Sequence, residues 1–318
     1  MDKKNSLKKR IFKGIAGTLI IVTVVSVGAT ELICGRIFRR AEPQKSNSAP
    51  ASSVACDADS VTFQSRGVQL RGWLYNVEKS RALIVMVHGF HDDQDCFSLL
   101  VKSFTKQGFS VLTFDGTAAG TSDGDRIVGI QQARYDTLAA LDYVASRSEL
   151  SDIPVVLFGY SMGAYGVLTA MNDADASPAA VIAVAGCNAT TDLMVSCAEK
   201  YVSVFANLGR PFLWMRDRIT SGADGDKTAA EALENAAWPV LLVQGADDTT
   251  VPYELSAYCK GIDSGNKNVS CLLVSAAGHA DHSGVLPRSD DGSGLEADET
   301  EKSLIDDIVR FIEDSLKH

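Results

Sequence analysis

Histidine and metal-binding patterns are scarce in this chain. Only five histidines occur among 318 residues, and neither a CxxC pair nor a histidine-rich stretch indicates a metal site. No internal repeat is present, which argues against a repeat architecture. We therefore expect no bound metal, and few side chains that could exchange a proton near neutral pH.

The body of the chain also lacks a surplus of positive charge. The whole sequence carries a net charge of −10, whereas its first 45 residues contain ten Lys or Arg against three acids, which is +7. The remaining residues therefore carry −17. Because nucleic-acid binding needs a basic surface that neutralises phosphates, this charge argues against a nucleic-acid partner.

Only one stretch is long and apolar enough to cross a membrane. Residues 14–34 are mostly apolar, and residues 1–13 before them form a basic leader. The surplus of Lys and Arg before the stretch predicts a single-pass anchor with a cytoplasmic N-terminus and an exported body. Two alternatives stay open. The tripeptide ending at Ala29 fits a signal-peptidase site that would release a secreted protein, or the stretch is a buried helix of the body.

Residues 35–60 are predicted to link this segment to a domain over 61–318. The stretch from 41 to 60 is rich in Ser, Ala and Pro and has no periodicity, which is typical of a flexible tether. Seven cysteines occur, and the nearest pairs in sequence are Cys187 with Cys197 and Cys259 with Cys271. In an exported body they could form disulfides or remain buried free thiols.

Strand and helix patterns alternate through the body. Residues 61–75 alternate apolar and polar side chains around Arg66 and Gly67, which predicts a hairpin at a sheet edge. Six continuous apolar runs follow, at 82–89, 109–116, 153–160, 179–186, 238–245 and 268–278. Helical patterns separate most of them, at 95–107, 130–147, 163–172 and 252–261, and a last one spans 300–316. This order predicts an α/β fold with a doubly wound, mostly parallel sheet.

The interval from 188 to 236 breaks this alternation. It is long, and it contains two stretches with aromatic residues. We expect an inserted cap over the carboxyl ends of the strands, where α/β sheets bind ligands. The alternative is a pair of packing helices without a role in substrate binding.

Ser161 is the candidate nucleophile. It lies in Gly-Tyr-Ser-Met-Gly at 159–163, between a predicted buried strand and a predicted helix. A GxSxG match alone is weak evidence, but a strand, a sharp turn and a helix around it are typical of a nucleophile elbow. In that arrangement the serine hydroxyl projects above the sheet.

A serine nucleophile needs a base, and the base needs an acid to orient it. His279 follows the last predicted strand and is the preferred base, with His282 as the alternative. Asp248 follows the preceding strand and is the preferred acid, with its neighbour Asp247 as the alternative. The backbone N–H groups of Met162, after the serine, and of Phe90, after the first parallel strand, are the expected oxyanion donors. His88 is expected to support the loop before Phe90 rather than to transfer protons.

These motifs resemble the α/β-hydrolase superfamily, in particular its serine aminopeptidase-like and monoacylglycerol-lipase-like members that are anchored to membranes or exported. The resemblance covers about residues 61–316 and rests on five stretches in order, at 88–90, 114–125, 159–163, 245–252 and 278–279. The order Ser161, Asp248, His279 is that of the superfamily. One departure is Thr117, at a position where relatives often carry Arg.

The resemblance implies a serine hydrolase that acts on a small-molecule or lipid acyl substrate without a metal or organic cofactor. An ester or lipid hydrolase is the first expectation, and an aminopeptidase or amidase, a thioesterase and a non-catalytic binding protein are the alternatives. A peptidase that binds a free amine should place acidic cap residues, such as Glu199, Asp217 and Glu231, near Ser161. An apolar trough under Phe205, Phe212 and Trp214 would instead favour an acyl chain.

Overall fold

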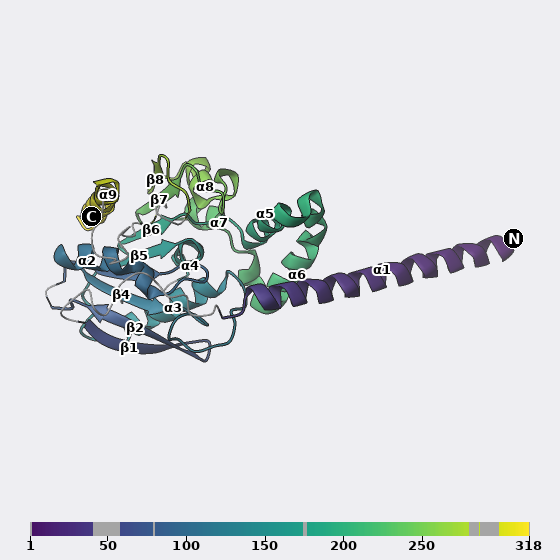
Figure 1. The fold of residues 1–318 in the computed structure, drawn as a ribbon, viewed down its shortest axis with the longest axis horizontal. Helices are drawn as coiled ribbons and strands as arrows, with labels where there is room; N and C mark the ends of the chain where they lie inside the picture. Colours follow the sequence, from purple (N-terminus) through teal and green to yellow (C-terminus); the bar gives the residue numbers. More distant parts are fainter. Residues whose placement is uncertain are drawn as a thin grey trace.

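A computed structural model describes residues 2–40, 58–78, 80–173, 177–279, 286 and 299–317. Among these residues, eight strands form one sheet in the order β1-β2-β4-β3-β5-β6-β7-β8 (Figure 1). The strands are β1 (Ala58–Ser65), β2 (Val68–Tyr75), β3 (Leu83–Val87), β4 (Ser110–Asp115), β5 (Val155–Tyr160), β6 (Ala180–Val184), β7 (Val240–Gly245) and β8 (Val269–Val274). The first two pair antiparallel, as do β2 and β4, and every other pairing is parallel.

The sheet confirms the predicted doubly wound α/β fold. Each of the six apolar runs contains one strand, and the hairpin at 61–75 is the antiparallel edge. The last run differs from the expectation of a strand buried on both faces. β8 is only partly buried because it is the other edge of the sheet, with a partner on one side only.

Helices cover both faces of the sheet. They are α2 (Ser98–Lys106), α3 (Gln132–Ala145), α4 (Met162–Ala170), α5 (Thr190–Val202), α6 (Arg210–Ser221), α7 (Ala229–Glu234), α8 (Ala257–Ser264) and α9 (Glu299–Ser315). One hydrophobic cluster joins a face of the sheet to α2 and α9. A second cluster joins the opposite face to α3, α4, α7 and α8.

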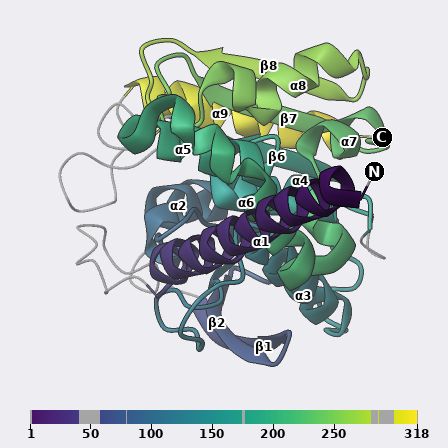
Figure 2. The ribbon, with the colours of Figure 1, turned by 90° about the vertical axis from the view of Figure 1, so that its right-hand side faces the viewer.

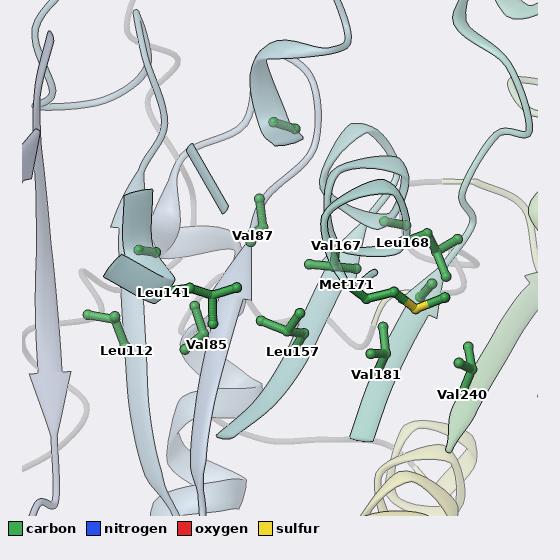
Figure 3. Packing of buried hydrophobic residues seen from close by; sticks show 14 of the residues in the cluster. Val85, Val87, Leu112, Leu141, Leu157, Val167, Leu168, Met171, Val181 and Val240 are labelled. Carbon is green, nitrogen blue, oxygen red and sulfur yellow. The ribbon is translucent and has the colours of Figure 1, made fainter. Parts of the chain in front are cut away.

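Figure 3 shows part of this second cluster. Leu157 and Val181 on adjacent strands point toward Val167 of α4 and Met171 directly after it, and Leu141 of α3 lies next to Val85 of β3. All of these side chains are at most 3% exposed. Burial of large aliphatic side chains on both faces of the sheet is the main favourable contribution to folding here.

The interval between β6 and β7 has two parts. α5, the 3-10 segment Ser203–Gly209 and α6 project from the body on the side from which the N-terminal helix leaves (Figure 1). α7 packs instead into the core through Ala229, Ala232 and Leu233. The last part of the predicted cap over 188–236 is therefore a core helix of the sheet.

The N-terminal helix α1 (Asp2–Ile37) is long and apolar enough to cross a membrane between Phe12 and Ile37, judged by length and composition. Almost none of its most apolar stretch is buried, which argues against a core helix of the body. It continues past residue 34 and ends against the body (Figures 1 and 2). Cys34 and Phe38 are buried there, and Arg40 donates hydrogen bonds to the carbonyl groups of Gly120 and Gly124.

Residues 35–40 of the predicted linker are thus bound to the body, and residues 41–57 lie outside the described part. All six described cysteines are free thiols, so neither of the two nearest pairs forms a disulfide. Burial raises the pKa of the Cys187 thiol to about 12, so this thiol stays protonated at neutral pH. The seventh cysteine, Cys56, lies outside the described residues.

Packing of α9 supports the half of the sheet that carries β6 to β8. Ile308 of α9 is fully buried in the cluster with β6 and α2. We expect Ile308→Ala to lower the free energy of unfolding by about 2–5 kcal/mol because it leaves a cavity. Urea unfolding of the detergent-solubilised full chain measures this change.

The matched control is Ile262→Ala on α8, where the side chain is 52% exposed. It should change the free energy of unfolding by less than about 0.5 kcal/mol. Equal losses in the two variants would contradict the assignment of α9 to the core.

Candidate active site

Ser161 stands in a sharp turn between β5 and α4. Its backbone has φ 54° and ψ −114°, a left-handed conformation that non-glycine residues seldom adopt. Its N–H donates a hydrogen bond to the carbonyl of Val184, at 2.8 Å. The turn therefore has the geometry of a nucleophile elbow, in which strain at one residue lifts its side chain above the sheet.

The two glycines of the turn are required by close backbone contacts. A Cβ atom at Gly163 would lie 1.9 Å from the carbonyl oxygen of Val87 at the end of β3. A Cβ atom at Gly159 would lie 2.4 Å from the carbonyl oxygen of Gly163. Both distances are far below van der Waals contact, so only glycine lets α4 start this close to the sheet.

The structure brings Ser161, His279 and Asp248 into one hydrogen-bonded line. The Oγ of Ser161 lies 2.8 Å from Nε2 of His279, and Nδ1 of His279 lies 2.8 Å from Oδ2 of Asp248. A carboxylate only accepts hydrogen bonds, so Nδ1 carries the proton of the neutral ring and Nε2 accepts from the serine hydroxyl. In this arrangement the histidine is ready to take the proton of Ser161.

The carboxylate of Asp248 is buried and fully engaged. The backbone N–H groups of Thr250 and Val251 donate to Oδ1, and the side-chain amide of Gln244 donates to Oδ2. Asp247 is exposed, so the sequence alternative for the acid does not face the histidine. The alternative base, His282, lies outside the described residues.

Two further residues position this line, and the sequence analysis missed both. The hydroxyl of Tyr160 donates to the carbonyl of His279 at 2.6 Å, which holds the loop after β8 over the elbow. Gln244 donates both to Asp248 and to the carbonyl of Val251. Tyr160 and Gln244 lie at the ends of β5 and β7, directly before the loops with Ser161 and Asp248. These positions were the signal in the sequence that could have identified them as site residues.

The loop after β3 carries the other predicted site residues. His88 is buried, its Nε2 accepts from the N–H of Gly116, and its Nδ1 lies 2.8 Å from the carbonyl of Gly89. Both ring nitrogens of His88 therefore hold the loop, which agrees with the expected supporting role. Phe90 and Met162, the expected oxyanion donors, pack in one apolar cluster beside the elbow.

Thr117 occupies the position where the sequence departs from the expected pattern. Its N–H and hydroxyl both donate to the buried carboxylate of Asp136, which also accepts from Ser65 and Gln132. Burial raises the pKa of Asp136 despite these donors. Thr117 therefore anchors the loop after β4 to α3 without the arginine.

Apolar side chains from the cap lie beside the elbow, and they are not the three that the sequence analysis names. Leu193 and Met194 of α5 and Leu213 of α6 pack in the cluster that contains Phe90 and Met162. Phe205 is 70% and Trp214 is 51% exposed, so these two side chains face mainly solvent. Phe212 is half-buried.

The three acidic cap residues do not gather at Ser161. Glu199 and Glu231 are exposed, and Glu199 accepts a hydrogen bond from Asn207. Asp217 is buried and accepts from the hydroxyls of Thr190 and Thr191, while burial raises its pKa. None of the three is hydrogen-bonded to Ser161, His279 or Asp248 among the described contacts.

The end of α1 contacts the loop that carries Phe90. The rings of Phe38 and Phe90 meet edge to face with centroids 6.0 Å apart, and Nε2 of His91 lies 3.2 Å from the carbonyl of Ile37. Arg216 of α6 lies over the other side of this contact, with its guanidinium 5.0 Å from the ring centroid of Phe38. The N-terminal helix is thus joined to the candidate oxyanion loop.

Comparison with known proteins places these elements in context. The family model described as serine aminopeptidase, S33, matches residues 78–221. A polyketide transferase of Aspergillus fumigatus is 33% identical over 107 residues, which cover 33% of this chain and 37% of that protein. A lysophosphatidylserine lipase of Macaca fascicularis is 29% identical over 186 residues, which cover 55% of this chain and 44% of that protein.

Solved structures share the fold at low sequence identity. An esterase of Pyrococcus furiosus matches with a TM-score of 0.65 at 15% identity, over 87% of this chain and 98% of that one. The described sheet and helices are therefore those of an α/β-hydrolase fold. The curated relatives named above are matched over less than half of their own length.

The close contact at Gly163 generates a test of the elbow. We expect Gly163→Ala to destabilise the protein by about 1–3 kcal/mol, because its Cβ overlaps the carbonyl of Val87 and must displace α4 or β3. Urea unfolding of the full chain measures the loss. Gly209→Ala is the control, since no heavy atom lies within 4 Å of its Cβ position. A neutral Gly163→Ala would show that α4 does not approach β3 this closely.

Proposed function

We propose that this protein is a serine hydrolase that cleaves carboxylic esters or other acyl bonds through an acyl-enzyme, because it has an α/β-hydrolase fold and its residues 78–221 match the serine aminopeptidase family model. The observation that carries this proposal is the line from Ser161 through His279 to Asp248, with two contacts of 2.8 Å. A serine, a base and an oriented acid at hydrogen-bond distance are the machinery of nucleophilic acyl transfer.

In the proposed reaction, the Oγ of Ser161 attacks the acyl carbonyl while its proton passes to Nε2 of His279. The carbonyl electron pair moves to the oxygen, where the N–H groups of Phe90 and Met162 stabilise the negative charge. Asp248 stabilises the charged imidazolium that forms. The intermediate then expels an alcohol, which takes the proton from Nε2.

Water completes the cycle. A water molecule gives a proton to Nε2 of His279 and attacks the acyl group on Ser161, and collapse of the second intermediate releases the acid and returns the proton to Ser161. These steps use only side chains, backbone N–H groups and water. The proposal therefore assigns no step to a metal or an organic cofactor.

An ester or lipid substrate is preferred over a peptide. The groups beside the elbow are apolar, with Leu193, Met194 and Leu213 next to Phe90 and Met162. The acidic residues Glu199, Asp217 and Glu231, which could have bound a free amine, are exposed or engaged elsewhere. The aminopeptidase remains the second candidate because the matching family model is described as a serine aminopeptidase.

Ser161→Ala tests the nucleophile. We expect it to abolish covalent labelling by a fluorophosphonate probe and to lower kcat for p-nitrophenyl esters by roughly 10⁴- to 10⁶-fold, since it removes the hydroxyl that lies 2.8 Å from Nε2 of His279. Ser264→Ala, a serine on the surface helix α8 that bonds only its own helix end, is the matched control and should label as wild type does. Folded wild-type protein that does not label would contradict the proposal.

A panel of substrates separates ester from peptide hydrolysis. Esters of increasing chain length and aminoacyl anilides are assayed with the same preparation. Turnover of anilides without turnover of esters would put the aminopeptidase first. Thioester turnover alone would favour the thioesterase, and a folded protein that binds acyl ligands without labelling would favour a non-catalytic binding protein.

For the membrane, the proposal is a retained single-pass anchor with a cytoplasmic N-terminus and a body on the far side. It is supported by the exposed apolar length of α1 between Phe12 and Ile37 and by the excess of Lys and Arg before it.

Intact mass of the membrane-extracted protein tests retention. We expect the full N-terminus, since the apolar stretch is longer than the hydrophobic region of a typical signal peptide. Ala29→Leu removes the small residue that a signal peptidase would need, and it should leave the processing unchanged. A mature protein that begins at Thr30, restored to full length by Ala29→Leu, would establish the secreted alternative.

A further inference from the structure

The most exposed apolar side chains of the described residues gather on two elements. One is α1, and the other is the cap tip, which we define as residues 200–219 at the end of α5, the 3-10 segment and α6. On the cap tip, five large apolar side chains are 70–89% exposed: Tyr201, Val204, Phe205, Leu208 and Ile219. Elsewhere in the described body, the exposed large apolar side chains are Tyr253, Ile262 and Leu273, and none of them is more than 52% exposed. Such a concentration is unusual for a surface that faces only water.

The cap tip lies beside the point where α1 leaves the body. Arg216 of α6 pairs with Glu31 of α1 at 3.4 Å and lies over the ring of Phe38. Both views show α1 passing along α6, and Figure 1 shows α1 and the cap projecting away from the sheet on the same side. The cap therefore lies beside the last turns of α1, where its apolar length meets the body.

The attachment of α1 leaves no free linker between a membrane and the cap. Cys34, at the end of the predicted span, is 1% exposed because it is already packed in the body. About twenty helical residues are needed to cross the apolar layer of a bilayer. An anchor that spans residues 14–34 therefore holds the α1 side of the body, including the cap tip, directly against the lipid surface.

The charge of the cap tip also fits a membrane interface. Residues 200–219 contain four Lys or Arg and one Asp, which is +3, whereas the chain after residue 45 carries −17. Aromatic and basic side chains together are typical of segments at the headgroup level, and anionic lipids attract the cations. Arg210 and Arg218 are paired with Asp192 and Asp226, so apolar contact rather than charge carries most of the attraction.

The opposite side of the same cap elements borders the candidate active site. Leu193 of α5 and Leu213 of α6 pack with Phe90 and Met162 next to Ser161. We propose that the cap tip inserts into the headgroup and upper acyl region of an anionic bilayer, and that the site receives its acyl substrate from that bilayer. The second clause rests on the proposed serine hydrolase, and the first rests only on the proposed membrane anchor.

Depth-dependent quenching tests the insertion. The full chain is reconstituted in vesicles of phosphatidylcholine and phosphatidylglycerol, with or without phosphatidylcholine brominated on its acyl chains. The signal is the tryptophan emission of a variant minus that of wild type. In Phe205→Trp, we expect the brominated lipid to quench this added emission. In the matched variant Ile262→Trp, on the α8 surface away from the cap tip, the added emission should not be quenched. Equal quenching in the two variants, or none in Phe205→Trp, would overturn the proposal.

A second copy of the chain is the competing occupant of the cap tip. If Phe205→Ser converts a dimer to a monomer in analytical ultracentrifugation, and brominated lipid does not quench Phe205→Trp, the cap tip pairs two copies and the lipid proposal is wrong. A protein whose oligomeric state does not change in Phe205→Ser, together with quenching in Phe205→Trp, supports the lipid.

Turnover of two substrates tests the delivery of substrate from the bilayer. In the double variant Phe205→Ser with Leu208→Ser, hydrolysis of a long-chain monoacylglycerol in the vesicles should fall about tenfold, because two apolar contacts with the lipid are lost. Hydrolysis of the soluble p-nitrophenyl acetate should not change, and Ile262→Ser should change neither. Equal loss on both substrates, or no loss, would overturn delivery from the bilayer. Failure of the serine-hydrolase proposal would look different, with no turnover of either ester in wild type and quenching still present.

Discussion

The contact between α4 and the end of β3 is the constraint on which the candidate site depends. Gly163 brings its helix so close to Val87 that a single methyl group would overlap the carbonyl oxygen. This contact fixes the left-handed turn at Ser161 and at the same time places the loop that starts at His88 beside it. The candidate nucleophile and one expected oxyanion donor are therefore positioned by the same backbone packing, which is more rigid than positioning by side chains alone.

The sequence predicts the parts of this site that follow directly from strand order. Ser161, Asp248 and His279 each come shortly after a continuous apolar run, and the carboxyl ends of parallel strands meet at one edge of a sheet. Recognising the strands is therefore enough to predict that Asp248 and His279 lie near Ser161, although they follow it by 87 and 118 positions in the chain. The choice of Asp248 over Asp247 also agrees with the structure, since only Asp248 turns into the buried network with Gln244.

The parts that the sequence does not predict depend on packing between distant segments. Nothing in the spacing shows that the hydroxyl of Tyr160 reaches the carbonyl of His279. The sequence left open whether aromatic residues of the cap line a trough, and Phe205 and Trp214 face outward. Periodicity gives the faces of a helix but not the surface that each face meets. The linker predicted from composition likewise begins with residues that are bound to the body, since Phe38 packs in a hydrophobic cluster with residues from other elements.

The end of α1 joins the tether and the site into one unit. Arg216 is only 8% exposed, and it lies between Glu31 of α1, Asp217 of its own helix and the ring of Phe38. A buried guanidinium is costly to leave without its partners, so α6 and the last turns of α1 stabilise each other's position. Phe38 in turn packs on Phe90. The angle at which α1 leaves the body is therefore coupled both to the cap, through Arg216, and to the candidate oxyanion loop, through Phe38.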